Sequence, residues 1–396
     1  MTDRAGTYIR QPTGYRSFLP KPLPPDPPIE WSDELVQALS DADRAVGRLD
    51  GLARNLPSND LFVAMYVKRE AVLSSQIEGT QSSLDDVLAF EAAIPGTQQP
   101  TDIAETVNYV KAMNAGIELL DELPLSGRLI REIHRELLTG VRGQERNPGH
   151  FRTSQNWIGP QGCTLNTATF VPPHPDDLLE TFRHLEVYLN DGSIPPIVQA
   201  ALSHAQFETI HPFLDGNGRV GRLLITLLLI EKGALAAPLL YLSLFLRANR
   251  TEYYDRLGRV RTHGDWEGWL RFFLQGVTVT ADDATDTAHA VAKLHASDVR
   301  MTSEFAFGTY GPAFVDLISQ QPVVTVAFVS EQLETSPTTA GLLLRKATDA
   351  GMIEEITGKK RNRIFRHSRL LDLFSTDETD PLMDNTRGQH ITRRSR

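Results

Sequence analysis

The amino-acid sequence predicts a mainly α-helical protein with one inserted β-hairpin and a smaller C-terminal unit. Three observations support this prediction. Apolar residues recur at helical spacing over most of the chain, as in LFVAMYVKREAVLSSQIEG. One stretch between helical segments, FRTSQNWIGPQGCTLNTATFVPP, instead brackets glycine and proline with aromatic and β-branched residues. Near the C-terminus, a weaker stretch at residues 297–304 is followed by a second group of helical patterns.

The composition is typical of a soluble globular protein of two or three domains. The chain has 396 residues, of which 41% are hydrophobic and 23% are charged. Its net charge of −10 argues against a surface that attracts nucleic acid everywhere, but it leaves room for a local basic patch. The single cysteine, Cys163, excludes an internal disulfide. Because there is no signal peptide and no membrane-length apolar run, we expect a cytoplasmic protein.

Residues 1–95 are expected to form an extended arm followed by helices. The arm contains the proline cluster LPKPLPPDPPIEW, which suits neither a helix nor a central strand. It is expected to lie across a folded surface. From Ser32 to about Phe90 the apolar spacing is helical, and Gly79 is a reasonable stop.

Residues 96–298 are expected to form the main helical domain, and residues 151–173 of it the inserted hairpin. After this hairpin, PPIVQAALSHAQFETI predicts a helix and HPFLDGNGR predicts a loop. The following RVGRLLITLLLIEKG is almost wholly apolar, so it predicts a central helix. The loop is therefore held between two helices.

This loop combines residue types that ordinary structure does not require. Gly216 and Gly218 stand directly before a helix, so successive backbone N–H groups and the helix dipole can bind an anion. Arg219 and Arg222 are three residues apart at the start of that helix and project from about one face. Guanidinium groups suit phosphate oxygens, and two of them imply more than one phosphate.

The other polar residues of the loop add a metal ligand and a base. Asp215 precedes the glycines, where one carboxylate can hold a Mg²⁺ ion that keeps most of its water. Asn217 can donate to a phosphate oxygen. His211 suits the removal of a proton from an attacking hydroxyl at neutral pH. Each feature alone is more often structural, but their conjunction favours a functional site.

The stretch HPFLDGNGRVGR, residues 211–222, resembles the signature of the Fic family, H-P-F-x-D/E-G-N-G-R-x-x-R, at every specified position. The helical segment from about residue 100 to 275 also resembles the family's core, so residues 96–298 are expected to be a Fic catalytic core. Fic proteins generally transfer AMP from ATP to a hydroxyl side chain. The resemblance therefore implies an adenylyltransferase that uses ATP with Mg²⁺ and modifies a tyrosine, threonine or serine of a target protein or of itself.

The resemblance also implies a role for each matching residue. His211 would deprotonate the incoming hydroxyl, and Asp215 would hold Mg²⁺ between the α- and β-phosphates. Asn217, with the amides of the two glycines, would bind the α-phosphate as charge develops. Arg219 and Arg222 would bind the β- and γ-phosphates, so that pyrophosphate leaves.

Two further features of the family have counterparts outside the loop. The predicted hairpin resembles the flap that holds a target segment by main-chain pairing, with Ile158 and Gly159 as the expected docking positions. Tyr254 falls where family members line the adenine pocket with an aromatic side chain. Ordinary helix packing explains an aromatic residue there about equally well.

A second motif lies upstream, in SSQIEG. Ser74 and Glu78 are four residues apart and share one helical face, and Gly79 follows. Taken alone, this is an ordinary helix end. It also resembles the family's inhibitory motif S/T-x-x-x-E-G/N, whose glutamate pairs with the second arginine of the signature, here Arg222. Glu78 would then occupy the guanidinium group that the γ-phosphate needs, and the resting enzyme would have almost no activity.

Residues 305–372 resemble a winged-helix domain, which often accompanies Fic proteins of this layout. VAFVSEQLETSPTTAGLLLRKATDAGMI contains two helical patterns with a short turn between them, and TGKKRNRIFRH suits a wing. Residues 356–370 contain six Lys or Arg residues and no acid. Such a domain suits DNA, a protein partner or a dimer contact about equally. Residues 375–396 are polar and unpatterned, so we expect a disordered tail.

Other functions are also compatible with the sequence. The main alternative is a nucleotide-sensing, DNA-binding transcriptional regulator with a Fic-like core, although the intact signature favours the enzyme. Hydrolysis by a metal on His204, His211 and Asp215 is disfavoured, because their spacing matches no recognised ligand pattern. The family resemblance also allows a homodimer.

Overall fold

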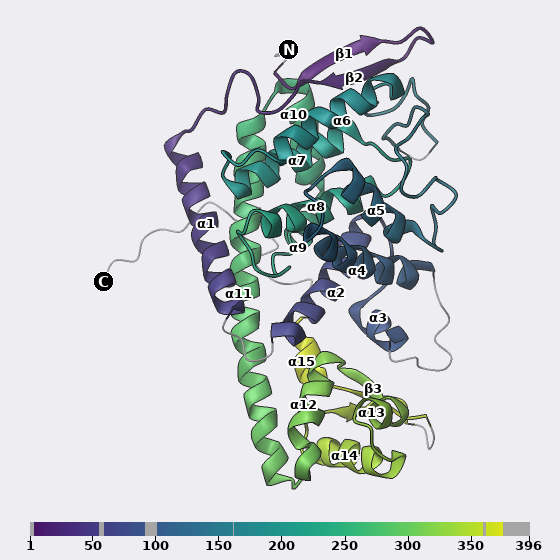
Figure 1. Ribbon diagram of the computed structural model, residues 1–396, viewed down its shortest axis with the longest axis vertical. Helices are drawn as coiled ribbons and strands as arrows, with labels where there is room; N and C mark the ends of the chain where they lie inside the picture. Colours follow the sequence, from purple (N-terminus) through teal and green to yellow (C-terminus); the bar gives the residue numbers. More distant parts are fainter. Residues whose placement is uncertain (1–3, 55–58, 92–100, 161, 359–361, 375–396) are drawn as a thin grey trace.

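The computed structural model describes residues 4–54, 59–91, 101–160, 162–358 and 362–374, and it is mainly helical, as the sequence predicts (Figure 1). The helices of the main body are α1 (Asp33–Ala53), α2 (Asn59–Ile77), α3 (Leu84–Glu91), α4 (Thr101–Leu120), α5 (Gly127–Leu138), α6 (Pro175–Leu189), α7 (Pro196–Ile210), α8 (Asn217–Glu231), α9 (Ser243–Ala248), α10 (Arg250–His263) and α11 (Trp266–Glu304). Within the described residues, no helix is both long and apolar enough to cross a membrane. The predicted tail, residues 375–396, lies outside the described residues.

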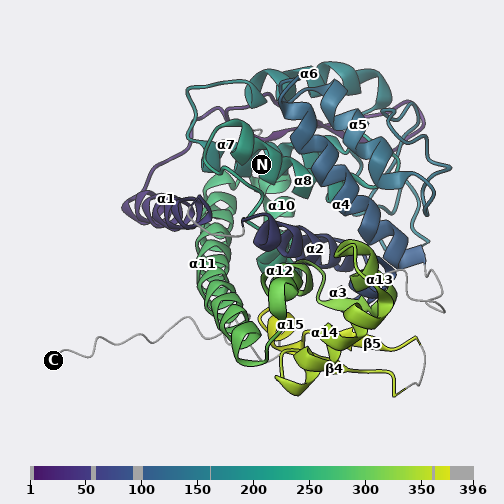
Figure 2. The ribbon, with the colours of Figure 1, turned by 60° about the horizontal axis from the view of Figure 1, so that its bottom comes forward.

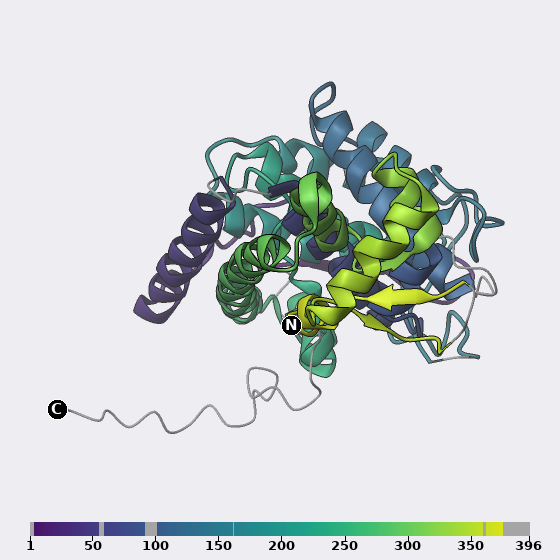
Figure 3. The same ribbon diagram turned by 90° about the horizontal axis from the view of Figure 1, so that it is seen from below.

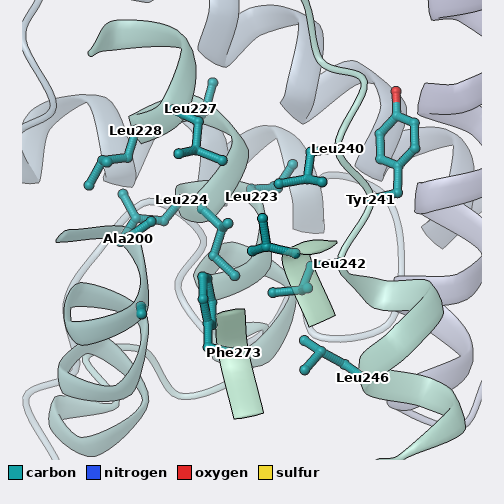
Figure 4. Close-up of a cluster of buried hydrophobic side chains, with 14 of the residues drawn as sticks. Ala200, Leu223, Leu224, Leu227, Leu228, Leu240, Tyr241, Leu242, Leu246 and Phe273 are labelled. Atoms are coloured by element: carbon teal, nitrogen blue, oxygen red, sulfur yellow. The ribbon is translucent and has the colours of Figure 1, made fainter. Parts of the chain in front are cut away.

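Helices α7 and α8 lie at the centre of the main body. Nearly every residue of both helices is buried, which agrees with the central position predicted for α8. Figure 4 shows leucines of α8 packed with residues of α7, of α11 and of the segment around α9. The labelled side chains are Ala200, Leu223, Leu224, Leu227, Leu228, Leu240, Tyr241, Leu242, Leu246 and Phe273. This packing holds the ends of the loop between α7 and α8 in place.

The first 20 residues contain a hairpin that the sequence analysis does not predict. Strands β1 (Gly6–Arg10) and β2 (Arg16–Pro20) pair antiparallel, whereas the proline cluster predicts an extended arm. The cluster begins only at the end of β2, so the residues before it remain able to pair. Phe18 is buried, and its N–H donates to the carbonyl of Val171 at 2.9 Å. The hairpin therefore lies against the segment predicted as the flap.

The predicted flap, residues 151–173, is a long loop rather than a regular hairpin. Its only regular pairing among the described residues is one isolated antiparallel bridge between Ile158 and Phe170. The Ile158 N–H donates to Phe170 O at 2.8 Å, and the Phe170 N–H donates to Ile158 O at 3.0 Å. Pro160 follows one side of the bridge and two prolines follow the other, and proline cannot donate to a strand ladder.

The C-terminal unit contains a three-stranded antiparallel sheet of order β3-β5-β4 and several helices. Its elements are η1 (Gly308–Tyr310), α12 (Gly311–Gln320), β3 (Val323–Thr325), α13 (Val326–Gln332), α14 (Pro337–Asp349), β4 (Glu354–Glu355), β5 (Ile364–Arg366) and α15 (Ser368–Asp372). It has a buried core of its own, which includes Phe314, Leu344 and Phe365. Figure 3 views the molecule from the end that carries this unit.

The C-terminal unit is attached to the main body through α2, α3 and α11 (Figure 2). Gln321 donates through Nε2 to Leu88 O at 2.8 Å, and the buried Asp298 lies 2.9 Å from His367 Nε2. The stretch at residues 297–304, which the sequence analysis takes as a weak connection, is the last part of α11. Asp298 in this stretch is buried by its contact with His367, and a buried polar residue weakens the apolar periodicity that predicts a helix.

Candidate active site

The sequence between α7 and α8 forces a sharp change of chain direction. His211 ends α7 in the left-handed region with a φ of 49°, and its N–H donates to Phe207 O at 2.9 Å. Pro212 has no N–H and cannot continue the helix. Gly216, with a φ of 77°, begins α8 in a conformation that favours glycine. Free backbone N–H groups of the first turn of α8 therefore face the same region as His211.

Two buried side chains hold this loop from inside. Asn217 is buried, and its side-chain amide accepts from Phe213 N–H and donates to Phe213 O, each at 2.8 Å. The side-chain oxygen of Asn217 and one of its two N–H donors are thus used within the loop, and its contact with a phosphate stays a prediction. His134 of α5 stacks on Phe213 at 3.7 Å, and its Nε2 lies 3.1 Å from Asp215 O. The loop is preorganised by these contacts.

His211 faces a cavity of about 570 Å³. Among the described residues that line it are Tyr8, Glu78, Trp157, Ile158, Gly159, Glu208, Gly218, Arg222, Tyr254 and Arg261. Burial and the nearby charges of Arg152 and Arg261 lower the pKa of His211 to about 4. The imidazole is therefore neutral at physiological pH and able to accept a proton.

Arg222 is bound by the end of α2 from two sides. Its Nε donates to Ser74 Oγ at 2.7 Å, and its Nη2 donates to Ser74 O at 3.0 Å and to Glu78 Oε1 at 2.7 Å. Burial raises the pKa of Glu78, but the charge and hydrogen bond of Arg222 outweigh it and hold that pKa below its usual value. A Cβ at Gly218 would collide with Glu78 Oε1. The Glu78 carboxylate thus lies against the first turn of α8 as well as on Arg222.

Arg219 has different surroundings. Its Nη1 donates to Glu105 Oε2 of α4 at 3.0 Å, and both side chains are almost completely buried. It is not among the described residues that line the cavity, although the sequence analysis places both arginines at the phosphates. The three-residue spacing alone does not indicate that a glutamate on another helix pairs with the first arginine.

Asp215 is the candidate Mg²⁺ ligand. Its side chain is 40% exposed, and its Oδ1 accepts from the Gly216 N–H at 2.6 Å. Within the described residues, no group of three or more His, Cys, Asp or Glu side chains is placed to hold a metal ion. A single accessible carboxylate beside a phosphate-binding helix terminus fits Mg²⁺, which keeps several waters and takes phosphate oxygens as its other ligands.

The other predicted positions border the cavity in different ways. Ile158 uses its own N–H and C=O on Phe170, so main-chain pairing with a target segment is left to its neighbours Trp157 and Gly159. A Cβ at Gly159 would lie 2.7 Å from Cys163 Sγ, so a larger residue there would have to displace the Cys163 side chain. Tyr254 lines the cavity with 42% of its surface exposed. Simple helix packing therefore explains Tyr254 poorly.

Several residues that line the cavity are absent from the sequence-based prediction, among them Tyr8, Glu208 and Arg261. Tyr8 comes from β1, Glu208 lies on the last turn of α7, and Arg261 of α10 stacks on Phe170 at 4.0 Å. Tyr8 and Arg261 reach the cavity through tertiary packing, which carries no local signal. The i, i+3 spacing of Glu208 and His211 at a helix end is a signal that could have identified Glu208.

Comparison with known proteins agrees with this geometry. Residues 36–118 match the model of the Fic/DOC family N-terminal domain, and residues 124–229 match the Fic/DOC family model. This region belongs to the Fic/DOC family. The matched segments contain Ser74 and Glu78 in the first case and the loop from His211 to Arg222 in the second.

The chain is similar to curated and solved proteins. It is 33% identical over 176 residues to a protein named protein adenylyltransferase Fic from Drosophila grimshawi, and 28% identical over 257 residues to one of the same name from Drosophila melanogaster. These matches cover 44% and 63% of the chain but only 32% and 47% of those proteins. The chain thus spans less than half of the relatives it matches.

Solved structures show the same fold. A Fic family protein from Desulfovibrio desulfuricans superposes with a TM-score of 0.56 at 22% identity, covering 86% of this chain and 97% of that one. A Fic domain containing signaling protein from Bacteroides thetaiotaomicron has a TM-score of 0.50 at 19% identity, covering 66% and 97%. The predicted mainly α Fic fold is confirmed.

Proposed function

We propose that this protein is an autoinhibited protein adenylyltransferase, which transfers AMP from ATP to a hydroxyl side chain of a target protein. The observation that carries the proposal is the placement of a neutral His211 beside Arg222 and the N-terminus of α8, in one cavity. This arrangement offers a base next to a binding site for several phosphate oxygens. Curated proteins to which the chain is similar carry the name of the same activity.

In this mechanism His211 Nε2 takes the proton of the target hydroxyl. The hydroxyl oxygen forms a bond to the α-phosphorus of ATP, and the bond from that phosphorus to the β-phosphate oxygen breaks, so pyrophosphate leaves. Backbone N–H groups of the first turn of α8, including that of Gly218 at the cavity, bind the α-phosphate, and Arg222 binds the γ-phosphate. Mg²⁺ held by Asp215 would neutralise charge on the phosphates. Asn217 stabilises the loop, and Arg219 ties the start of α8 to Glu105 of α4.

Autoinhibition follows from competition for Arg222. Glu78 holds Nη2 of Arg222 at 2.7 Å and lies against Gly218. A γ-phosphate must take this place, so while Glu78 remains there ATP binds without the in-line alignment that attack requires. When Glu78 is displaced, the guanidinium of Arg222 and the backbone N–H groups of the first turn of α8 become free to bind the nucleotide.

The target segment would enter between the flap and the N-terminal hairpin. Trp157, Gly159 and Tyr8 border the cavity on that side. Main-chain pairing with the flap would place the hydroxyl before His211. Since Tyr8 is itself a hydroxyl-bearing residue at this cavity, self-modification is part of the proposal. A homodimer and a cytoplasmic location remain predictions.

For the C-terminal unit we propose a winged-helix-like domain over residues 305–372. The order of helices α12 to α14 and the sheet β3-β5-β4 support this. The second candidate function is a transcriptional regulator, in which this domain binds DNA and the Fic-like core only senses nucleotide. Within the described residues, Arg366 lies 3.3 Å from Asp85 and Arg369 donates to Asp298. Two of the six basic residues between positions 356 and 370 are therefore already paired with acids. Lys359, Lys360 and Arg361 lie outside the described residues.

The proposed chemistry is tested with ATP labelled on either the α- or the γ-phosphate. Glu78→Gly protein is incubated with Mg²⁺ and a cell lysate, and Glu78→Gly with His211→Ala is the control. We expect protein-bound label from α-labelled ATP only, and none in the double variant. Label from γ-labelled ATP would indicate a kinase-like transfer. No label from either, together with DNA binding whose salt dependence is lost when Lys359, Lys360 and Arg361 are neutralised, would favour the regulator.

A further inference from the structure

Glu208 is a buried carboxylate at the base of the cavity, and neither the family signature nor the mechanism above uses it. It lies on the last turn of α7, three residues before His211, and only 7% of its surface is exposed. Its Oε2 is 3.8 Å from His211 Nδ1. Within the described residues, Glu208 Oε1 and His211 Nδ1 both lack a hydrogen-bond partner. Glu208 Oε2 therefore faces an unsatisfied ring nitrogen of His211 across a gap slightly longer than a hydrogen bond, while Oε1 points toward Gly221.

The neighbouring buried histidine of α7, in contrast to His211, has a hydrogen-bond partner on each ring nitrogen. His204 lies one turn earlier and uses both ring nitrogens, with Nδ1 2.9 Å from Gly221 O and Nε2 2.8 Å from the hydroxyl of Tyr253. Since an unpaired buried carboxylate is costly, a purely structural position would favour an apolar residue. Gly221 makes room for this carboxylate, because a Cβ there would lie 2.7 Å from Glu208 Oε1.

The charges around Glu208 come from several elements. Burial raises the pKa of Glu208 to about 7, and Glu78 at the end of α2 adds to this effect. The guanidinium groups of Arg222 and Arg261, on α8 and α10, oppose it. For His211, burial and the charges of Arg152 and Arg261 disfavour the protonated form, and this effect outweighs the opposing contributions of the Glu208 backbone and of the Glu78 charge. A base in such surroundings needs a nearby negative charge when it accepts a proton.

We propose that Glu208 is a positioning residue for His211, and this inference rests on the proposed function. Its carboxylate accepts a hydrogen bond from Nδ1–H, so the free lone pair of His211 lies on Nε2, toward the target hydroxyl. When Nε2 takes the hydroxyl proton, Nδ1 keeps its own, and Glu208 stabilises the imidazolium ion. The gap of 3.8 Å closes by about 1 Å as the reacting complex forms, since such contacts are often long without substrate.

The test compares Glu208→Gln and Glu208→Asp in the Glu78→Gly background, with Glu180→Gln on the exposed face of α6 as the control substitution. We expect Glu208→Gln to lower kcat for AMP transfer about a hundredfold while KM for ATP stays unchanged. Glu208→Asp should recover part of the loss. The rise of kcat with pH near 7, which reflects ionisation of Glu208, should disappear in Glu208→Gln.

A second measurement does not depend on turnover. The imidazole of His211 is titrated by NMR in the same proteins, and its pKa should be lower in Glu208→Gln than in the parent. Unchanged kcat and an unchanged His211 pKa would overturn the inference, as would a loss confined to KM for ATP. If Glu78→Gly is itself inactive, the proposed function fails, and the NMR titration still decides whether Glu208 acts on His211.

Discussion

Arg219 and Arg222 lie on the same helix, three residues apart, but their acidic partners differ. The side chain of Glu105, the partner of Arg219, is 1% exposed near the start of α4, whereas that of Glu78, the partner of Arg222, is 33% exposed just beyond the end of α2. Burial raises the pKa of Glu105, despite the charges of Arg219 and Arg142, while Arg222 holds that of Glu78 below its usual value. A fully buried pair supports the fold, and a pair at a cavity wall can exchange its carboxylate for a ligand's oxygens.

The largest expected effect concerns the buried pair. Glu105→Ala leaves the guanidinium of Arg219 buried without its main partner, so the free energy of unfolding should fall by about 3 kcal/mol. Urea denaturation of the purified protein measures this change. A loss below about 1 kcal/mol would show that Arg219 can find another partner or water, and it would remove the contrast between the two arginines.

The next effect concerns the other contact of Arg222. Ser74→Ala removes the hydroxyl that accepts from Arg222 Nε at 2.7 Å, so a buried donor is left unpaired. The free energy of unfolding should fall by about 1 to 2 kcal/mol, and AMP transfer should rise because Arg222 is held less firmly. A stable variant with unchanged transfer would indicate that Glu78 alone holds the arginine.

The pH dependence of stability distinguishes the two carboxylates further. Since the folded pKa of Glu78 is below its usual value near 4.5, its ionised form stabilises the protein above about pH 4.5. This contribution is lost as the pH falls through the folded pKa. The difference in unfolding free energy between wild type and Glu78→Gln should therefore shrink from pH 5 toward pH 3. A difference that grows on acidification would contradict the assigned pair.

The smallest effect is expected at the surface. Arg142 also approaches Glu105, at 3.3 Å, but its side chain is 60% exposed. Arg142→Gln should change the free energy of unfolding by about 0.5 kcal/mol or less, because solvent screens such pairs. Thermal unfolding at low and high salt checks this expectation. A larger loss would mean that Glu105 depends on two arginines rather than on Arg219.

Much of this arrangement is readable from the sequence, but only where the signal is local. The loop from His211 to Arg222 is contiguous, and Ser74 and Glu78 share a helical face, so both segments stand out without a structure. The predicted pairing of Glu78 with Arg222 appears as a contact of 2.7 Å. The roles assigned to these residues in catalysis remain predictions.

The parts that the sequence does not reveal depend on packing between distant segments. Glu105 is 114 residues from Arg219, and Tyr8 reaches the cavity only because the N-terminal hairpin packs on the flap. The side chain of Asn217 is used within its own loop, which its residue type does not indicate. The hairpin predicted over residues 151–173 appears only as one isolated bridge, because prolines interrupt its pairing.

The most direct test of the account is the rate of AMP incorporation from α-labelled ATP, measured for wild type and Glu78→Gly at the same temperature and ATP concentration. Glu122→Gly, an exposed acid just beyond the end of α4, is the matched control. We expect Glu78→Gly to transfer AMP at least about tenfold faster than wild type, which corresponds to about 1.4 kcal/mol, with the control unchanged. Equal rates in wild type and Glu78→Gly would contradict the claim that an exchangeable Glu78–Arg222 pair silences the enzyme.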